Sequence, residues 1–214
     1  MDPYFYKYLK YKTKYLGLFS QIGGKRKYDY YLIHATKFDN MWSILKDGVI
    51  YPGKDLDASR RVLSGGEPQD SIYTNIYFED LENLKIVQMD YNIIFHPKLL
   101  YEYDWDINSP SREICGKIRH KLSDTKDVDK KINEIKQFVK NPDLPERVKF
   151  GGIFTHEILI KDNIPVRGNV VAIICNYCSE QQINKLKRLI NKYKYKIKIY
   201  DRIKFPSLKE LYIK

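Results

Sequence analysis

The chain has 214 residues and a formal charge of +11, with 43% hydrophobic and 14% aromatic residues. This apolar content is enough for a core, which excludes wholesale disorder, and the length fits one domain with an extension. No stretch approaches the length of a membrane span, and lysines interrupt the N-terminal region, so neither a membrane helix nor a secretion signal is predicted. The charge suits phosphate in nucleic acid or a nucleotide, but it is spread along the chain and equally fits a solvated surface.

The first 24 residues differ in pattern from the rest. Their apolar residues recur at near-helical spacing between lysines, as Phe5, Tyr8, Leu9 and Leu16 show. This pattern predicts a basic amphipathic helix, which either docks on the folded body or lies on a membrane or a partner groove. We therefore divide the chain into a leader, residues 1–24, and a single domain, residues 25–214.

The leader also carries a specific motif. It reads Lys-Tyr-Leu-Lys-Tyr-Lys from residue 7, Lys-Tyr-Leu from residue 14, and Gly23-Gly24. This resembles the N-terminal signature of many proteins from giant DNA viruses of the mimivirus type. The resemblance implies a viral protein of the virion or of the viral factory in the host cytoplasm, which is not secreted. It implies no reaction.

Within residues 25–214 the hydrophobic periods predict an α+β domain. Strands are expected at residues 28–36, 49–51, 71–79, 85–96, 153–161, 169–175 and 196–201, and helices at 38–46, 111–122, 127–140 and 180–193. Asp39 or Asn40 is expected to cap the first of these helices, and Gly48 to end it. Residues 54–70 are polar and contain Ser64-Gly65-Gly66-Glu67-Pro68, which predicts a mobile loop.

The three cysteines, Cys115, Cys175 and Cys178, do not suit a disulfide framework and favour a reducing, intracellular setting. Cys175 and Cys178 form a Cys-x-x-Cys pair at the end of an apolar strand. The pair lacks two further ligands for zinc and the upstream context of a thioredoxin-like unit. The sequence therefore predicts no metal site.

Three short segments bring chemically useful residues into a recognisable order. They contain His34 at the end of the first strand, Tyr77 with Tyr73 just before it, and Glu157 at the start of a later strand. Taken singly, each has a plainer interpretation as a structural histidine, a core aromatic ring or a solvated strand end. Their order is what favours a shared site.

This order resembles the ADP-ribosyltransferase superfamily of the His-Tyr-Glu type, whose fold has split, mostly antiparallel sheets with flanking helices. The matching motifs are His34-Ala35-Thr36, Ile44-Leu45-Lys46-Asp47-Gly48, Ile76-Tyr77-Phe78-Glu79-Asp80 and Glu157-Ile158-Leu159-Ile160. The sequence departs from the family where Ala35 and Asn75 stand at positions at which glycine is usual.

The resemblance implies NAD as the substrate and assigns a role to each residue. His34 and Thr36 would hold the ribose and diphosphate side, and Glu157 would be the catalytic carboxylate. Tyr77 or Tyr73 would stack on the nicotinamide ring, and Tyr77 is preferred for its Ile-Tyr-Phe-x-Asp setting. Arg60 or Arg61 could meet the diphosphate, although a solvated loop arginine is the plainer interpretation.

The predicted function is mono-ADP-ribosyl transfer from NAD to a protein or nucleic-acid acceptor. Two alternatives stay open at this point. One is a catalytically inactive ADP-ribosyltransferase-like module of the virion. The other is a basic nucleic-acid-binding protein, although the chain has no RNP, KH or zinc-finger signature.

Overall fold

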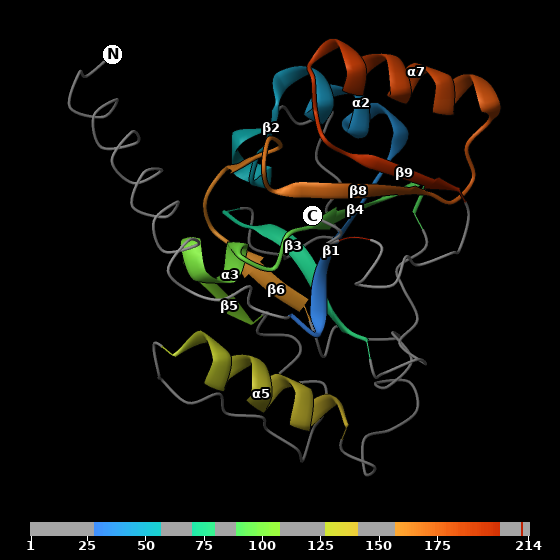
Figure 1. Ribbon diagram of the computed structural model, residues 1–214. Coiled ribbons are helices and arrows are strands. Elements are labelled where there is room, and N and C mark those ends of the chain that lie inside the picture. The colour runs from blue at the N-terminus through green and yellow to red at the C-terminus, as the bar shows by residue number, and fades with distance from the viewer. Residues whose placement is uncertain are drawn as a thin grey trace.

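The computed structural model describes residues 28–56, 70–79, 89–107, 127–140, 157–201 and 211. Several predictions lie outside these residues: the leader helix, the helix at 111–122, most of the loop at 54–70 with Arg60 and Arg61, and Cys115. The described residues form an α+β fold in which helices flank a mostly antiparallel sheet (Figure 1). The predicted fold class is therefore confirmed. No described helix has the length and apolar character needed to span a membrane.

The helices and strands follow the predicted order, with shifted ends. The strands are β1 (Tyr30–Thr36), β2 (Val49–Ile50), β3 (Ile72–Phe78), β4 (Tyr91–Phe95), β5 (Trp105–Ile107), β6 (Glu157–Ile160), β7 (Ile164–Pro165), β8 (Val170–Cys175) and β9 (Lys198–Asp201). The α-helices are α2 (Phe38–Asp47), α3 (Leu99–Glu102), α5 (Val128–Val139) and α7 (Glu180–Lys192), and a 3-10 turn covers Gly53–Asp55. The sequence did not predict α3, β5 or β7, because such short elements show no hydrophobic period.

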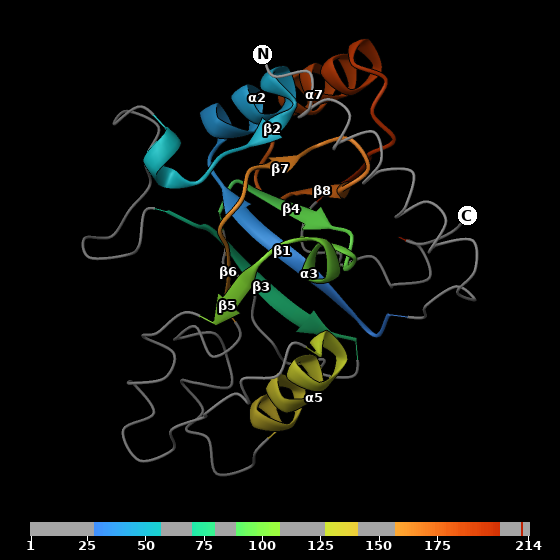
Figure 2. The same ribbon diagram turned by 90° about the vertical axis from the view of Figure 1, so that its left-hand side faces the viewer.

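The main sheet has seven strands in the order β5-β6-β3-β1-β4-β8-β9, and β2 pairs separately with β7. All neighbouring strands are antiparallel except β8 and β9, which are parallel and joined through α7. Two parallel neighbouring strands need a crossover connection, and α7 provides it between β8 and β9. Figure 2 shows β1 in the middle of the sheet, with α2 and α7 at one end of the molecule and α5 at the other.

The two faces of the sheet carry different clusters, because successive side chains along a strand point to opposite sides. One face, which we call the helix face, includes Leu32 of β1 and packs on Met41 of α2, Leu186 of α7 and Ile135 of α5. The other, which we call the second face, bears a smaller buried cluster: Tyr31, Ile33, Tyr77, Ile94, Ala172, Ile174 and Leu211.

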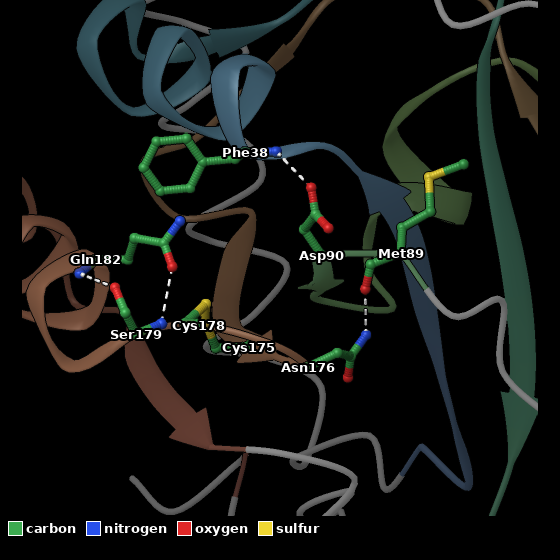
Figure 3. Close-up of a disulfide and its surroundings, with 8 residues drawn as sticks. All are labelled: Phe38, Met89, Asp90, Cys175, Asn176, Cys178, Ser179 and Gln182. Carbon is green, nitrogen blue, oxygen red and sulfur yellow. Dashed lines mark hydrogen bonds between the residues drawn. A yellow bond between two sulfur atoms is a disulfide. The ribbon is translucent and has the colours of Figure 1, made fainter.

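The helix starts are satisfied in two different ways. In α2 the N-cap is Lys37, which makes no side-chain cap, and the Phe38 N–H donates to Oδ2 of Asp90 at 3.1 Å (Figure 3). The predicted cap by Asp39 or Asn40 is therefore wrong, because a carboxylate from the neighbouring strand region takes that place. In α7, Ser179 and Gln182 form a reciprocal capping box.

The junction between β8 and α7 carries a disulfide between Cys175 and Cys178 (Figure 3). Their Cα atoms lie 5.6 Å apart, a separation that a disulfide can bridge. The expectation that the cysteines would form no disulfide is corrected for this pair, since the turn between β8 and α7 brings both side chains together. Asn176, between them, donates its side-chain amide to the Met89 carbonyl and so ties the junction to the segment before β4.

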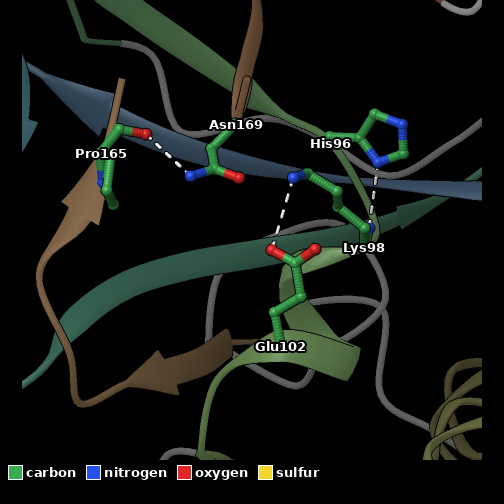
Figure 4. Close-up of polar contacts among 5 residues, drawn as sticks. All are labelled: His96, Lys98, Glu102, Pro165 and Asn169. Carbon is green, nitrogen blue, oxygen red and sulfur yellow. Dashed lines mark hydrogen bonds and ion pairs between the residues drawn. The ribbon is translucent and has the colours of Figure 1, made fainter. Parts of the chain in front are cut away.

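Backbone and side-chain contacts also join β4 and β8 at their other ends, away from the disulfide (Figure 4). The His96 N–H donates to the Asn169 carbonyl at 2.8 Å, and the Asn169 amide donates to the Pro165 carbonyl at 2.9 Å. His96 Nδ1 accepts the Lys98 N–H at 3.1 Å, where the chain turns into α3. These contacts hold β4, β7 and β8 in one unit.

Two glycines with positive φ give a matched stability test. Gly48 ends α2 at φ 74°, and a Cβ there would meet the Tyr195 hydroxyl at 2.9 Å. Gly168 has φ 80° with nothing within 4 Å of its Cβ position. We expect Gly168→Ala to cost about 1 kcal/mol from backbone strain, and Gly48→Ala to cost more because a contact is added. Urea unfolding checks this, and equal losses would contradict the contact at Gly48.

Candidate functional site

The main sheet divides between β1 and β3. Their pairing ends where Ile33 faces Asn75. Beyond that point residues 34–36 of β1 pair only with β4, and residues 72–74 of β3 pair only with β6. The sheet therefore consists of two halves, β1-β4-β8-β9 and β3-β6-β5, which are joined through the first four residues of β1.

Glu157 lies at this point of division. Asn75 pairs with Ile33 on one side and with Glu157 on the other, so the three residues form one row across the sheet. Directly opposed side chains share a face, with their Cβ atoms about 4.5–5.5 Å apart. The amide of Asn75 and the carboxylate of Glu157 are therefore neighbours on the second face, and they are only 7% and 5% exposed.

Two hydrogen bonds hold the strands on either side of this row. His34 Nδ1 donates to the Tyr73 carbonyl at 2.7 Å, which joins the two halves just beyond their last paired residues. A carbonyl can only accept, so the ring carries its proton on Nδ1. The buried Thr74 hydroxyl donates to the Ile158 carbonyl at 3.2 Å and supports the β3–β6 register beside Glu157.

Both candidate tyrosines lie on the same face as Glu157, but their surroundings differ. Tyr77 is 4% exposed, stacks on Tyr31 with ring centroids 6.1 Å apart, and belongs to the second-face cluster. Burial raises the pKa of the Tyr77 hydroxyl. Tyr73 is half-buried and faces Leu159, which puts it diagonally across from Glu157. The register thus places Tyr73, Asn75 and Glu157 together.

His34 and Thr36 lie elsewhere. The alternation along β1 puts both side chains on the helix face, where the His34 ring is 6.5 Å from the Phe95 ring. Thr36 is only 4% exposed. Neither residue shares a face with Glu157, and His34 is joined to the site by its hydrogen bond to the Tyr73 carbonyl. The NAD-binding roles of His34 and Thr36 stay predictions, as do those of Arg60 and Arg61 outside the described residues.

Asn75 is the residue that sequence reasoning noted only as a departure from a glycine. A signal was available, because an amide between apolar strand neighbours must either reach solvent or take a buried partner. No group of three or more His, Cys, Asp or Glu side chains that could hold a metal occurs in the described part of the chain.

Residues 27–142 match the family described as "Family of unknown function (DUF5846)". The chain belongs to this family. It is also 38% identical over 178 residues to "Uncharacterized protein R11" of Acanthamoeba polyphaga mimivirus, a match that covers 80% of this chain. The match covers 65% of that relative, so this DUF5846 protein spans somewhat less than two thirds of the relative's length.

The fold is similar to that of a known ADP-ribosyltransferase. The structure of Thermus sp. 2.9 DarT in complex with carba-NAD+ superposes with a TM-score of 0.51 at 11% identity. The match covers 83% of this chain and 97% of that one. DarT in complex with ADP-ribosylated ssDNA gives 0.49 at 10% identity, so the fold comparison rests on the first complex. The DUF5846 chain thus has a DarT-like ADP-ribosyltransferase fold.

The half-buried His34 ring gives a pH prediction. Burial lowers the pKa of His34 below its ordinary 6.5, so the unfolded chain takes up a proton in a range where the folded chain does not. The stability present above pH 6.5 is therefore lost as pH falls toward the folded pKa. His34→Gln keeps an amide donor for the Tyr73 carbonyl but cannot titrate, and it should reduce this loss.

Urea unfolding above and below pH 6.5 measures the effect. Some pH dependence should survive in the variant, because burial and the nearby Lys98 lower the pKa of His96 to about 4. If the variant and the natural protein lose equal stability between the two pH values, His34 does not carry the effect.

Proposed function

We propose that this protein transfers ADP-ribose from NAD to a protein or nucleic-acid acceptor. The observation that carries the proposal is the position of Glu157: a buried carboxylate at the division of a sheet with an ADP-ribosyltransferase fold. A solvated strand end does not explain a glutamate that is 5% exposed, because burying a carboxylate costs free energy that a surface position would avoid.

The proposed reaction breaks the bond between C1′ of the NAD ribose and the nicotinamide nitrogen. Nicotinamide leaves with the bonding electron pair, and positive charge develops on the ribose. The Glu157 carboxylate accepts a hydrogen bond from a ribose hydroxyl and stabilises this charge. An oxygen or nitrogen of the acceptor then bonds to C1′ and gives up its proton to water. The Asn75 amide beside Glu157 would orient the carboxylate.

Of the two tyrosines, we favour Tyr73 for stacking on the nicotinamide ring. Tyr73 is half-buried and lies diagonally across from Glu157, whereas Tyr77 already stacks on Tyr31 within a buried cluster. In this arrangement the main role of His34 is to hold the Tyr73 backbone in position through its hydrogen bond to the Tyr73 carbonyl. Contacts from His34 and Thr36 to the ribose and diphosphate side, and from Arg60 or Arg61 to the diphosphate, complete the proposal.

The inactive alternative also has an observation in its favour. Thr36 is buried on the helix face, and His34 Nδ1 is already bonded within the protein. An inactive protein would either bind NAD without transferring ADP-ribose or not bind NAD at all. Thermal unfolding with NAD separates the cases, since a ligand that binds the folded state raises the melting temperature.

A viral location is part of the same proposal. The relative from Acanthamoeba polyphaga mimivirus supports a viral protein. A place in the virion or in the viral factory rests on the leader motif in residues 1–24.

Glu157→Gln tests the chemistry. It removes the charge but keeps the size, so we expect transfer of label from NAD to fall about 10²–10³-fold while the melting temperature stays close to that of the natural protein. Glu102→Gln is the control, because Glu102 pairs with Lys98 on α3 and should leave transfer unchanged. Undiminished transfer in Glu157→Gln would refute the proposed mechanism.

Tyr73 variants test the stacking assignment. Tyr73→Ala should weaken NAD binding about fivefold or more, since stacking of a base on an aromatic ring contributes roughly 1–3 kcal/mol. Tyr73→Phe keeps the ring and should bind normally, as should Tyr77→Phe. Calorimetric titration with NAD gives the three affinities. Normal binding by a folded Tyr73→Ala protein would shift the assignment away from Tyr73.

A further inference from the structure

The segment from residue 185 to residue 198 carries an unusual concentration of positive charge. It has seven Lys or Arg residues in 14 positions and no Asp or Glu. This is half a charge per residue, whereas the whole chain has +11 over 214 residues. All seven side chains are exposed. The view of the charge as evenly spread is therefore corrected for this segment, and compositional drift alone does not explain the local excess.

Six of these residues form two rows, which we call the α7–β9 basic surface. They are Lys185, Arg188, Lys192, Lys194, Lys196 and Lys198. The first three recur at helical spacing along α7, and residues three or four apart lie on one side of a helix. The last three alternate with the half-buried Tyr195 and Ile197 on the way into β9, the edge strand.

The turn between the two rows is anchored on both sides. The Arg167 guanidinium donates to the Tyr193 carbonyl at 2.8 Å, and the Tyr195 hydroxyl donates to the Leu45 carbonyl at the end of α2 at 3.2 Å. The Tyr195 N–H also bonds the Ile190 carbonyl at 2.9 Å. The cations therefore project from a supported backbone, so less conformational entropy is lost when they bind a partner.

Lys194 has a backbone conformation that a lysine rarely adopts. Its φ is 54°, and it is the sole non-glycine residue with positive φ in the described part of the chain. Glycine would take this left-handed conformation without a Cβ penalty. Because glycine at position 194 would remove this backbone strain, the presence of lysine suggests that its side chain has a function.

We propose that the α7–β9 basic surface binds nucleic acid through its phosphate backbone. Closely spaced, preorganised cations are the feature that phosphate binding requires. A membrane fits less well, because an interfacial helix inserts apolar side chains. Here Leu186 and Ile190 of α7 are buried in the core, and Tyr177 is the exposed large hydrophobic residue of the described chain.

This surface is separate from Glu157. In the strand order β9 lies five strands from β6, which corresponds to roughly 24 Å at the usual strand spacing. The surface is therefore a docking site, and nucleic acid bound there would have to extend across the sheet to approach Glu157. The inference goes beyond the proposed reaction and stands without it, since binding needs no NAD.

Two charge-matched triple variants of the full chain test the proposal. The first is Arg188→Gln, Lys192→Gln and Lys196→Gln on the basic surface. The control is Lys54→Gln, Lys130→Gln and Lys161→Gln, which changes three exposed lysines elsewhere and gives the same net charge. Binding of a fluorescent single-stranded oligonucleotide is measured across a salt series, and binding of phosphatidylserine vesicles is measured alongside.

We expect the surface variant to bind the oligonucleotide more weakly and its salt slope to fall by about 0.7 for each lost phosphate contact. The control should change little. Equal loss in both variants, or vesicle binding with no oligonucleotide binding, would overturn the proposal.

Lys194→Gly adds an independent readout. Relief of the left-handed strain should raise the melting temperature by about 2–4 °C, while loss of the cation should weaken oligonucleotide binding. A more stable protein with undiminished binding would show that the Lys194 side chain serves no phosphate contact.

Discussion

The row formed by Ile33, Asn75 and Glu157 is the constraint on which the rest of the fold depends. Pairing between β1 and β3 ends there, so this row both joins the two halves of the sheet and marks where they part. The hydrogen bond from His34 to the Tyr73 carbonyl and that from Thr74 to the Ile158 carbonyl hold the strands on either side. A shift of one residue in this register would turn Glu157 to the helix face.

Much of the fold was readable from the sequence, because β1, α2, β8 and α7 have long and regular hydrophobic periods. The candidate site was only partly readable. Sequence order linked His34 with Glu157, but the alternation along the strands puts them on different faces. The choice between Tyr73 and Tyr77, and the closeness of Asn75 to Glu157, depend on cross-strand register and burial, which a single sequence does not contain.

The net charge of the sequence likewise says less about function than the positions of the charged residues in the structure. The total of +11 suited either a functional or a compositional explanation. The structure separates them at one place, where α7 and β9 bring exposed cations onto a turn anchored by Arg167 and Tyr195. The Glu157 row and this surface lie on distant strands, so nucleotide chemistry and polyanion binding need not compete for the same residues.

The central claim is that NAD binds where the two halves of the main sheet part, at the row that contains Glu157. A crystal structure of the protein with carba-NAD+ bound tests it most directly. The account predicts that the ribose next to the nicotinamide lies within hydrogen-bond distance of the Glu157 carboxylate, with Tyr73 against the nicotinamide ring. An analogue bound at the α7–β9 basic surface, or anywhere else with nothing near Glu157, would contradict it.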